Sequence, residues 1–463
     1  MLHGMGVSAE ALTPIDSFAL SSAPNQSSMD VIVIGGGIAG VATAYQLNAA
    51  GHRVCVIERH ATVAQGATYG HGGALLPTPL DVWFGPTFMK VKGSRAARTG
   101  VVYKPGFNSA TRRFMQHLGR LAQHDAFREQ YRRLKPLVDL ARESLSSIET
   151  HLALEFEQRS GVLHVVRHAR EWEQTQSALE LLREFEVRHH VLSSQECGDI
   201  EHSVPTEPDF AGGVLFEHER IGNCPLFTKL VKQALEDRGG VQFMLGRAVE
   251  ALRLDNQRAA VELAVARSDR ARARDVDVVS ADAIVVAAGA GSLSLLERAG
   301  LHLPLHPARF FTLTSPIAYE ERAPHLTVVD TVRRITMTRA NQRVRVAGAA
   351  LVQPEREIAK PAAEPLAKAA TALLAQATHD WIPGAARISA AHAWDGVKLL
   401  SPDGLPVVGQ AVHPRLFVNA GHGPSGWGLA CGSAKVIADL ISGSEPAVPS
   451  ETLAALRADR FAH

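Results

Sequence analysis

DVIVIGGGIAG, residues 30–40, is the stretch of sequence that decides the fold of this 463-residue chain. It begins with a short, almost entirely apolar run that ends in glycines, which predicts a strand buried inside a parallel sheet. The pattern then becomes helical from Ile38 to Ala50, and Gly51 offers a left-handed end to that helix. A second apolar strand is expected from Arg53 to Ile57. The stretch therefore predicts a βαβ unit in a parallel sheet.

The glycines of this unit satisfy the pattern G-x-G-x-x-G. Gly35 permits the tight turn, Gly37 lets the backbone approach a pyrophosphate, and Gly40 lets the helix pack closely on the sheet. The first helical residues, Ile38-Ala39, would present N–H groups and the positive dipole end to phosphates. Glu58 ends the second strand, where it can accept hydrogen bonds from ribose hydroxyls and repel the 2′-phosphate of NADP. The unit predicts a dinucleotide site and leaves FAD and NAD open.

Composition excludes several other classes of protein. Hydrophobic residues make up 46%, charged residues 21%, and the net charge is +1, so nucleic acid is not the expected partner. The sequence contains neither a Cys-x-x-Cys pair nor a His-Glu-x-x-His motif, so no metal site is expected. The sequence contains no apolar run of about 18 residues, so no membrane-spanning helix is expected. The four cysteines are scattered, which fits a reducing compartment: Cys55, Cys197, Cys224 and Cys431.

Further strands are predicted in separate parts of the chain. Apolar strands are expected at Ala283–Ala288 and Leu416–Ala420, and antiparallel strands at Phe310–Thr314, Arg334–Thr338 and Arg343–Ala349. The prediction is an α/β fold, with a Rossmann-like dinucleotide-binding domain built from discontinuous segments and an α+β substrate domain with an antiparallel or mixed sheet. The dinucleotide domain is assigned residues 29–85, 205–300 and 390–463, the substrate domain residues 86–204 and 301–389, and a flexible N-terminal extension residues 1–28.

A second glycine-rich loop follows the strand at Leu416–Ala420 and leads into a helix near Ala430–Ile441. Its sequence, NAGHGPSGWG at residues 419–428, suits the stabilisation of negative charge at N1 and C2=O of a reduced flavin. A plain tight turn rich in glycine is the alternative. The loop favours FAD over NAD, with expected contacts from Gly423, Pro424, Ser425, Gly426 and Trp427.

Four stretches of the chain resemble the D-amino acid dehydrogenase branch of the D-amino acid oxidase-like flavoprotein family. They are the Gly35–Gly40 unit with Glu58, GATYGHGGALLP at 66–77, GVKLLSPDGLPVVG at 396–409 and GHGPSGWGLACG at 421–432. The helix-forming segment Asn223–Gln233 is also similar to the family. The likeness extends from Met29 to about Ser450.

The resemblance implies an FAD that is bound without a covalent link, so Cys431 is expected to be a packing residue. It implies hydride transfer from the Cα of a D-amino acid to flavin N5, followed by hydrolysis of the imino acid to a 2-oxo acid and ammonia. Electrons would pass to a quinone or another respiratory acceptor, in the bacterial cytoplasm or on the inner face of its membrane. It adds these FAD contacts: Arg59, Thr68, Gly73, Ala74, Leu75, the Val249-Glu250 pair, Ala288 and Gly289.

Two positions depart from the family pattern. Lys398 stands where the family has an arginine that binds the substrate carboxylate, and lysine lacks the planar two-pronged donor. Phe311 stands where relatives often have a tyrosine that helps to hold the same carboxylate. Either Lys398 binds the carboxylate with help from His71, Tyr69 or Arg309, or the substrate is not an ordinary α-amino acid.

Two further side chains near this site have open roles. Asp395 either accepts a hydrogen bond from the cationic amine or forms an ion pair with Lys398. His71 replaces an asparagine common in relatives, and it either orients the substrate and tunes its protonation or is a surface or packing residue. The altered positions leave alternatives open: a dehydrogenase of a secondary amine or imino acid (D-proline-, sarcosine- or glyphosate-like), or a flavin-binding subunit without activity.

A basic segment suggests membrane contact. Twelve Lys and Arg residues lie between Lys90 and Lys135, against only Asp125 and Glu129, and aromatic residues precede them at 83–88. Such a segment could dock on anionic lipid headgroups. The alternative is a solvated helix face.

Overall fold

A computed structural model describes residues 28–75, 100–103, 109–121, 123–264, 277–352 and 360–461. The predicted βαβ unit forms the centre of a six-stranded sheet, in which every pair except β17 with β18 is parallel. In spatial order its strands are β17 (Val407–Gln410), β18 (Leu416–Ala420), β11 (Ala283–Val286), β1 (Asp30–Ile34), β2 (Arg53–Glu58) and β7 (Val241–Leu245).

Both faces of this sheet are covered, which is why β1 is apolar on both sides. Val31 and Val33 point into a core shared with helices, and Ile32 and Ile34 point into a second core shared with a small sheet. The helices are α1 (Ile38–Ala49), α3 (His124–Leu152), α6 (Cys224–Arg238) and α10 (Gly426–Ile441). The small sheet consists of β8 (Val249–Leu254), β9 (Ala259–Leu263) and β10 (Val278–Ala281), with α7 (Ser292–Arg298) packed beside it.

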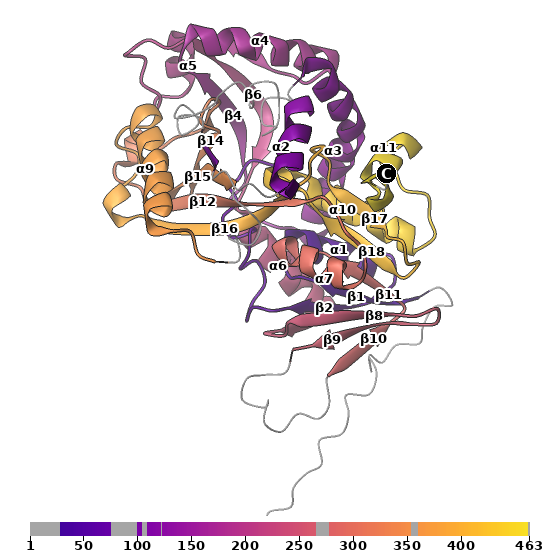
Figure 1. Cartoon of the computed structure of the whole chain (residues 1–463). Helices are drawn as coiled ribbons and strands as arrows, with labels where there is room; N and C mark the ends of the chain where they lie inside the picture. Colours follow the sequence, from indigo (N-terminus) through magenta and orange to yellow (C-terminus); the bar gives the residue numbers. More distant parts are fainter. Residues whose placement is uncertain are drawn as a thin grey trace, which may run out of the picture.

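A second large sheet, nine-stranded and mixed, lies above the six-stranded sheet in Figure 1. Its strands in spatial order are β16 (His392–Leu400), β12 (His306–Pro316), β15 (Arg343–Val352), β14 (Ile335–Ala340), β13 (Thr327–Asp330), β4 (Arg159–Val166), β6 (Gly212–Ile221) and β5 (His190–Leu192), with β3 (Val101–Tyr103) beside β15.

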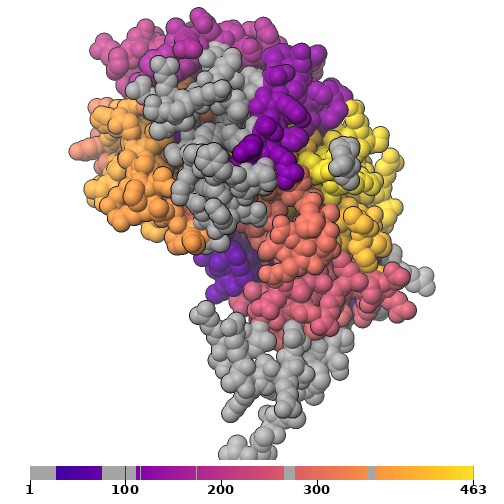
Figure 2. Space-filling view, in the orientation of Figure 1, coloured from indigo at the N-terminus to yellow at the C-terminus, as the bar shows by residue number. Residues whose placement is uncertain are grey.

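The remaining helices lie around these sheets. Helix α9 (Glu364–Trp381) packs on the nine-stranded sheet through Leu374 and Trp381. In Figure 2 the small sheet forms the lower described surface, and the yellow C-terminal segment lies on the right. The others are α2 (Ser109–Leu121), α4 (Ala169–Glu184), α5 (Ser194–Ile200), α11 (Ser450–Leu456) and the short 3-10 turns η2 (Gly289–Gly291), η3 (Glu320–Arg322), η4 (Ile388–Ala390), η5 (Gly423–Ser425) and η6 (Ala458–Phe461).

The α/β prediction is confirmed, but the sheets divide the chain at other points than the predicted domain boundaries. Strands β6 and β16 belong to the nine-stranded sheet, although they fall in segments assigned to the dinucleotide domain. Helix α3 falls in a segment assigned to the substrate domain, yet it contributes to the core on the helix-covered face of the six-stranded sheet. Local patterns identify a strand or helix, whereas its partner is chosen by contacts far along the chain. The predicted N-terminal extension lies outside the described residues, apart from Ser28.

Candidate active site

The glycine turn after β1 brings three elements into close contact. Gly35 has a φ of 112°, which favours glycine, and a Cβ there would lie 2.5 Å from the carbonyl oxygen of Ala287. A Cβ at Gly40 would lie 1.8 Å from the carbonyl oxygen of Gly35. Helix α1, strand β1 and the end of β11 therefore meet as closely as backbones allow. This is the packing that the G-x-G-x-x-G pattern predicts.

The N-terminus of α1 suits an anionic ligand. Its N-cap residue, Gly37, has no capping side chain, and no acidic residue lies in the first turn. The N–H of Ile38 donates to Thr68 Oγ1 at 3.0 Å, which ties the loop after residue 66 to this turn. The positive end of the helix dipole therefore meets no carboxylate of its own first turn, as a pyrophosphate site requires.

Glu58 is buried at the carboxyl end of β2. Its Oε2 accepts from Gly36 N at 2.6 Å, and its Oε1 accepts from His60 N at 2.8 Å. These bonds place the carboxylate beside the glycine turn, which is the position that the predicted hydrogen bonds to ribose hydroxyls require. The β7–β8 turn is tied to the same place, because Arg247 N donates to Glu58 O at 2.9 Å. The Val249-Glu250 pair begins β8 directly after this turn.

His71 joins the two loops that were expected to flank the flavin ring. Gly73 N donates to His71 Nδ1 at 3.2 Å, so Nε2 carries the proton and donates to the carbonyl oxygen of Pro424 at 3.0 Å. Burial, and to a smaller extent the charge of Lys398, lowers the pKa of His71 to about 3. The ring is therefore neutral near pH 7 with both nitrogens in use. The geometry supports an orienting role and does not support proton exchange with a substrate amine.

Removal of the buried His71 imidazole should be visible in the pH dependence of stability. A His71→Gln variant should unfold with a shallower pH dependence between about pH 6.5 and 4 than the wild type. The folded pKa lies below the unfolded value, so the unfolded state binds more protons in this window and wild-type stability falls as the pH falls. Urea unfolding at several pH values measures the effect, with the exposed His392→Gln as the matched control. Equal slopes for His71→Gln and the wild type would contradict it.

Lys398 lines a cavity of about 90 Å³ between the two loops and the nine-stranded sheet. Its Nζ lies 5.0 Å from the ring centroid of Phe310, and Phe311, Pro424 and Ser425 line the same cavity. Among the residues that the structure describes, no carboxylate forms an ion pair with Lys398. Burial lowers the pKa of Lys398 to about 8. A buried cation without an anion of its own is suited to bind an anionic group of a ligand.

The structure corrects the expected surroundings of Asp395. Its carboxylate pairs with Arg309 on the neighbouring strand and not with Lys398. Residues three apart in a strand point to opposite faces of the sheet, which explains why Asp395 and Lys398 are separated. Arg309 also donates to the carbonyl oxygen of Lys360 at 2.6 Å. Arg309 and Asp395 do not line the cavity that contains Lys398.

Phe311 and Tyr69 occupy different places. Phe311 lines the cavity and is buried, without a hydroxyl to offer a ligand. Tyr69 is half-buried outside the lining of this cavity and packs against Trp394, with ring centroids 6.2 Å apart. The guanidinium of Arg345 lies 5.9 Å from the Tyr69 ring centroid and donates to the carbonyl oxygen of His71 at 3.2 Å.

Two arginines of this region were not expected from the sequence. Arg345 alternates with buried Val344 and Val346, a pattern typical of an outward-facing residue. The loop that contains His71 covers this face of β15, so Arg345 is half-buried. Arg334 was expected in a strand, but it lies in the turn before β14 and lines the cavity with Lys398. The adjacent pair Arg333-Arg334 beside the expected strand was the feature of the sequence that could have indicated a role for Arg334.

Burial raises the pKa of the Cys431 thiol to about 12, as suits a packing residue rather than a reactive one.

The basic segment is described in part. In α3, Arg128 forms an ion pair with Glu184, and Arg132 forms one with Glu451. This arrangement favours a solvated, ion-paired face. The preceding aromatic residues and Lys90–Arg98 lie outside the described residues.

No group of described residues has the composition of a metal site, and no described helix is long and apolar enough to cross a membrane. Ala288 and Gly289 follow β11 into η2, at the same edge of the six-stranded sheet as the glycine turn. Parallel α/β sheets bind their ligands at this carboxyl edge.

Comparisons with known proteins agree with this geometry. The family model described as FAD dependent oxidoreductase (DAO) matches residues 30–440. A D-amino acid dehydrogenase of Cereibacter sphaeroides is 32% identical over 430 residues, which cover 92% of this chain and 94% of that protein. One from Bradyrhizobium diazoefficiens is 29% identical over 439 residues, covering 94% and 99%.

Two solved structures are similar in fold. Glycine oxidase from Geobacillus kaustophilus has a TM-score of 0.67 at 19% identity, covering 94% of this chain and 99% of that one. L-proline dehydrogenase from P. horikoshii has a TM-score of 0.65 at 14% identity, covering 95% and 99%.

The glycine turn and the carboxylate after β2 have the arrangement of a dinucleotide-binding site at the carboxyl edge of a parallel sheet. The chain belongs to the FAD dependent oxidoreductase (DAO) family. The expected cofactor class, FAD, is thereby confirmed.

Proposed function

We propose that this protein is a dehydrogenase that converts a D-amino acid to its 2-oxo acid and ammonia. The observation that carries the proposal is Lys398, a buried cation without a carboxylate partner among the described residues, in a cavity bordered by both expected cofactor loops. The D-amino acid dehydrogenases named above support the same substrate class, because they match more than nine-tenths of the chain. When bound, FAD would supply the acceptor for the two electrons of amine oxidation.

FAD binding is proposed to be non-covalent, through residues of the six-stranded sheet's carboxyl edge and of the two glycine-rich loops. The glycine turn and the start of α1 would bind the pyrophosphate, and Glu58 the ribose. On the adenosine side the proposed contacts are Arg59, Val249-Glu250, Ala288 and Gly289. Around the ring system they are Thr68, Gly73, Ala74, Leu75 and the segment Gly423–Trp427.

The cavity residues would then orient the substrate. Lys398 binds the α-carboxylate, and the apolar side chains of Phe310, Phe311 and Ala347 keep water from the reacting carbon. Positive charge from Lys398 and Arg334 disfavours the protonated form of the substrate amine. The amine therefore loses its proton more readily in the cavity than in water, as oxidation requires. Neutral His71 keeps the two loops in register and takes no proton.

A product assay tests this proposal. The purified FAD-containing protein, with a soluble dye as electron acceptor, should release 2-oxo acid and ammonia in equal amounts from D-amino acids. No product from any D-amino acid would contradict the proposal. Release of product from a secondary amine alone would support the second candidate function, a dehydrogenase of a secondary amine or imino acid. This candidate is favoured by the two departures from the family pattern, lysine in place of arginine at Lys398 and phenylalanine in place of tyrosine at Phe311. Bound FAD with no turnover of any amine would indicate a subunit without activity.

The electron acceptor is proposed to be a quinone or another respiratory carrier, with the protein on the inner face of a bacterial membrane or in the cytoplasm. The relatives are named dehydrogenases and not oxidases, which supports an acceptor other than oxygen. Reduction of a soluble quinone analogue during turnover, with little oxygen consumed, is the expected result. Equal rates with oxygen alone would contradict it.

The charge of Lys398 leads to a pH-dependent prediction. Because the pKa of Lys398 is about 8, it loses its charge as the pH rises through this value. The Kd of propanoate, a carboxylate without an amine, should therefore rise by up to about tenfold per pH unit above pH 8. In a Lys398→Arg variant it should stay nearly constant to pH 10, because arginine keeps its proton. Titration followed by the flavin spectrum measures both, and a constant wild-type Kd from pH 7 to 10 would contradict the role.

A further inference from the structure

Three successive carbonyl groups of the loop Gly70-His71-Gly72 are held by side chains of the nine-stranded sheet. In chain order, their oxygens accept from Thr312 Oγ1 at 2.8 Å, from Arg345 Nη1 at 3.2 Å and from Thr338 Oγ1 at 2.8 Å. The three donors lie on β12, β15 and β14, which are neighbours in the sheet. The loop is therefore tied to three strands at once.

The three donors share one face of the sheet. Thr338 is paired directly with Arg345, and Thr312 is paired with Ala347, two residues further along β15. Directly paired residues and alternate residues of a strand point to the same face. The intervening residues 344 and 346 point the other way, into the core that β15 shares with α9. One face of these strands thus carries the loop and the other carries a helix.

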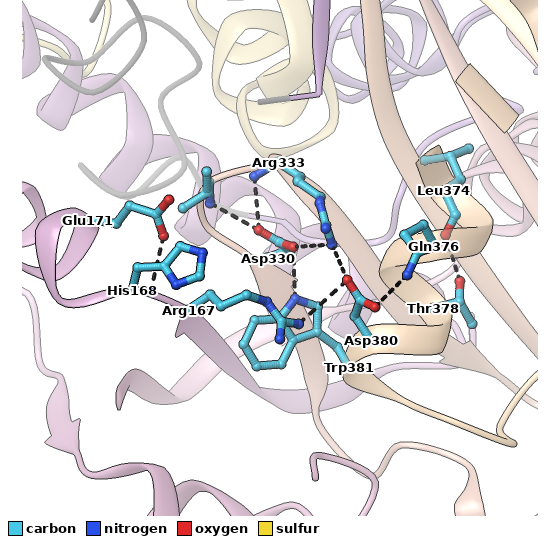
Figure 3. A network of polar contacts seen from close by, with 11 residues as sticks. Arg167, His168, Glu171, Asp330, Arg333, Leu374, Gln376, Thr378, Asp380 and Trp381 are labelled. Carbon is cyan, nitrogen blue, oxygen red and sulfur yellow. Dashed lines mark hydrogen bonds and ion pairs between the residues drawn. The ribbon is translucent and has the colours of Figure 1, made fainter. Parts of the chain in front are cut away.

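Helix α9 fixes the strands from that other face. The indole of Trp381, at the end of α9, donates through Nε1 to Asp330 at the end of β13, at 2.8 Å (Figure 3). The ion pair of Arg333 with Asp380, 2.8 Å apart, joins the turn after β13 to the same helix (Figure 3). Because the strands are held from behind, a loop tied to them has a defined position.

Glycine lets the loop lie close to the sheet. A Cβ at Gly70 would lie 1.9 Å from the ring of Trp394, and a Cβ at Gly72 would lie 3.0 Å from the Cβ of Ala347. Trp394 is paired with Thr312, so it belongs to the same face of the sheet. Larger residues at these two positions would push the loop away, and its carbonyl groups would no longer reach the hydroxyls.

The same loop connects the sheet with both ends of the proposed FAD site. Just before it, Thr68 Oγ1 accepts from Ile38 N at the start of α1, at 3.0 Å. Within it, His71 donates to the carbonyl oxygen of Pro424 in the second glycine-rich loop, at 3.0 Å. His71 also lines the proposed substrate cavity. A shift of the loop would therefore disturb the pyrophosphate end and the ring end of the cofactor site together.

We propose that Thr312, Thr338 and Arg345 are positioning residues that hold this loop in the arrangement that binds FAD. None of the three is a proposed FAD contact, so each acts through the carbonyl group that it holds. When one of these hydrogen bonds is removed, the loop spends part of its time in other arrangements, and the measured Kd of FAD rises in proportion. The inference rests on the FAD contacts proposed for this loop and is independent of the substrate.

Release of FAD from the purified FAD-containing protein on dilution, followed by flavin fluorescence, measures this Kd. Thr312→Val keeps the shape of the side chain and removes the hydroxyl, so it should raise the Kd by about 3-fold to 12-fold, the range for one hydrogen bond. Thr312→Ser restores the hydroxyl and should bind FAD nearly as the wild type does. The double variant Thr312→Val/Thr338→Val should bind FAD more weakly than either single variant. Arg345→Lys keeps a charged donor and should retain more affinity than Arg345→Met.

Thr378→Val is the matched control. Thr378 is 3% exposed, against 2% for Thr312, and its hydroxyl donates to the carbonyl oxygen of Leu374 at 2.9 Å within α9 (Figure 3). The substitution therefore removes a buried hydroxyl–carbonyl hydrogen bond of the same kind, away from the loop. It should lower the melting temperature and leave the Kd of FAD unchanged. If Thr312→Val and Thr378→Val have the same Kd for FAD, the inference is wrong.

The visible circular dichroism of the bound flavin separates positioning from a loss of stability, because it reports how the ring system is held. At saturating FAD it should differ between the wild type and the double variant, and it should be unchanged in Thr378→Val. A double variant with a lower melting temperature but the wild-type Kd and spectrum would show a purely structural role and overturn the inference.

The same variants separate this inference from the proposed function. If FAD binding depends on Thr312 and Thr338 but no D-amino acid is oxidised by the wild type, the proposed function is wrong and the inference stands. If D-amino acids are oxidised and the Kd of FAD is the same in all of these variants, the inference is wrong and the proposed function stands.

Discussion

Replacing Lys398 with alanine should lower kcat/KM for the amino acid substrate by about 5-fold to 150-fold, the equivalent of about 1–3 kcal/mol for a charged hydrogen bond. The physical reason is that Lys398 is the buried cation between the expected cofactor loops, without a described carboxylate partner of its own. Most of the loss should be in KM if the carboxylate is bound equally in the ground and transition states.

Two control variants make the result specific. Lys398→Arg should retain most of the efficiency, because it keeps the charge and adds the two-pronged donor. Lys368→Ala removes an exposed lysine that pairs with Glu364 on the surface of α9, and it should have no effect. An unchanged kcat/KM for Lys398→Ala would remove Lys398 from the proposed site and leave the family assignment intact.

Replacing Gly40 with alanine should give a protein that loses FAD on purification. A helix interior normally gains up to about 1 kcal/mol when glycine is replaced by alanine. Here the added Cβ would lie 1.8 Å from the carbonyl oxygen of Gly35, so the helix must move away from the sheet. Backbone displacement of this kind costs about 1–3 kcal/mol or more and opens the turn proposed to hold the pyrophosphate.

The ratio of flavin absorbance to protein absorbance measures the effect, together with the melting temperature. Gly66→Ala is the matched control, because a Cβ at Gly66 meets no atom within 4 Å and its φ is not in the left-handed region. It should retain FAD. Full retention of FAD by Gly40→Ala would contradict the close packing of α1 on the glycine turn.

The cofactor half of the molecule could be predicted because its signals are local. The strand, turn and helix of residues 30–50 are contiguous, and the strand at Leu416–Ala420 has the bounds that were expected. The assignments of β6 and β16 to the other sheet could not be read in this way. Their partners, β4 and β12, come from distant parts of the chain, and a strand pattern does not name its partner.

The candidate site could be predicted only in part for the same reason. Lys398 and Phe311 were identified by their departure from the family pattern, and both line the cavity. The tautomer of His71 depends in part on a carbonyl 353 residues further along the chain. Arg334 lines the cavity from the turn before β14, and the position of this turn depends on α9, because the indole of Trp381 donates to Asp330 at the end of β13. Such arrangements are tertiary, and no local pattern encodes them.

The central claim is that the protein binds FAD and oxidises a D-amino acid anchored by Lys398. The most direct test is the visible absorption spectrum of the purified protein before and after anaerobic addition of D-amino acids. The expected result is a flavin band that a D-amino acid bleaches, and that bleaches much more slowly in Lys398→Ala. A purified protein whose bound flavin is bleached by no D-amino acid would contradict the account.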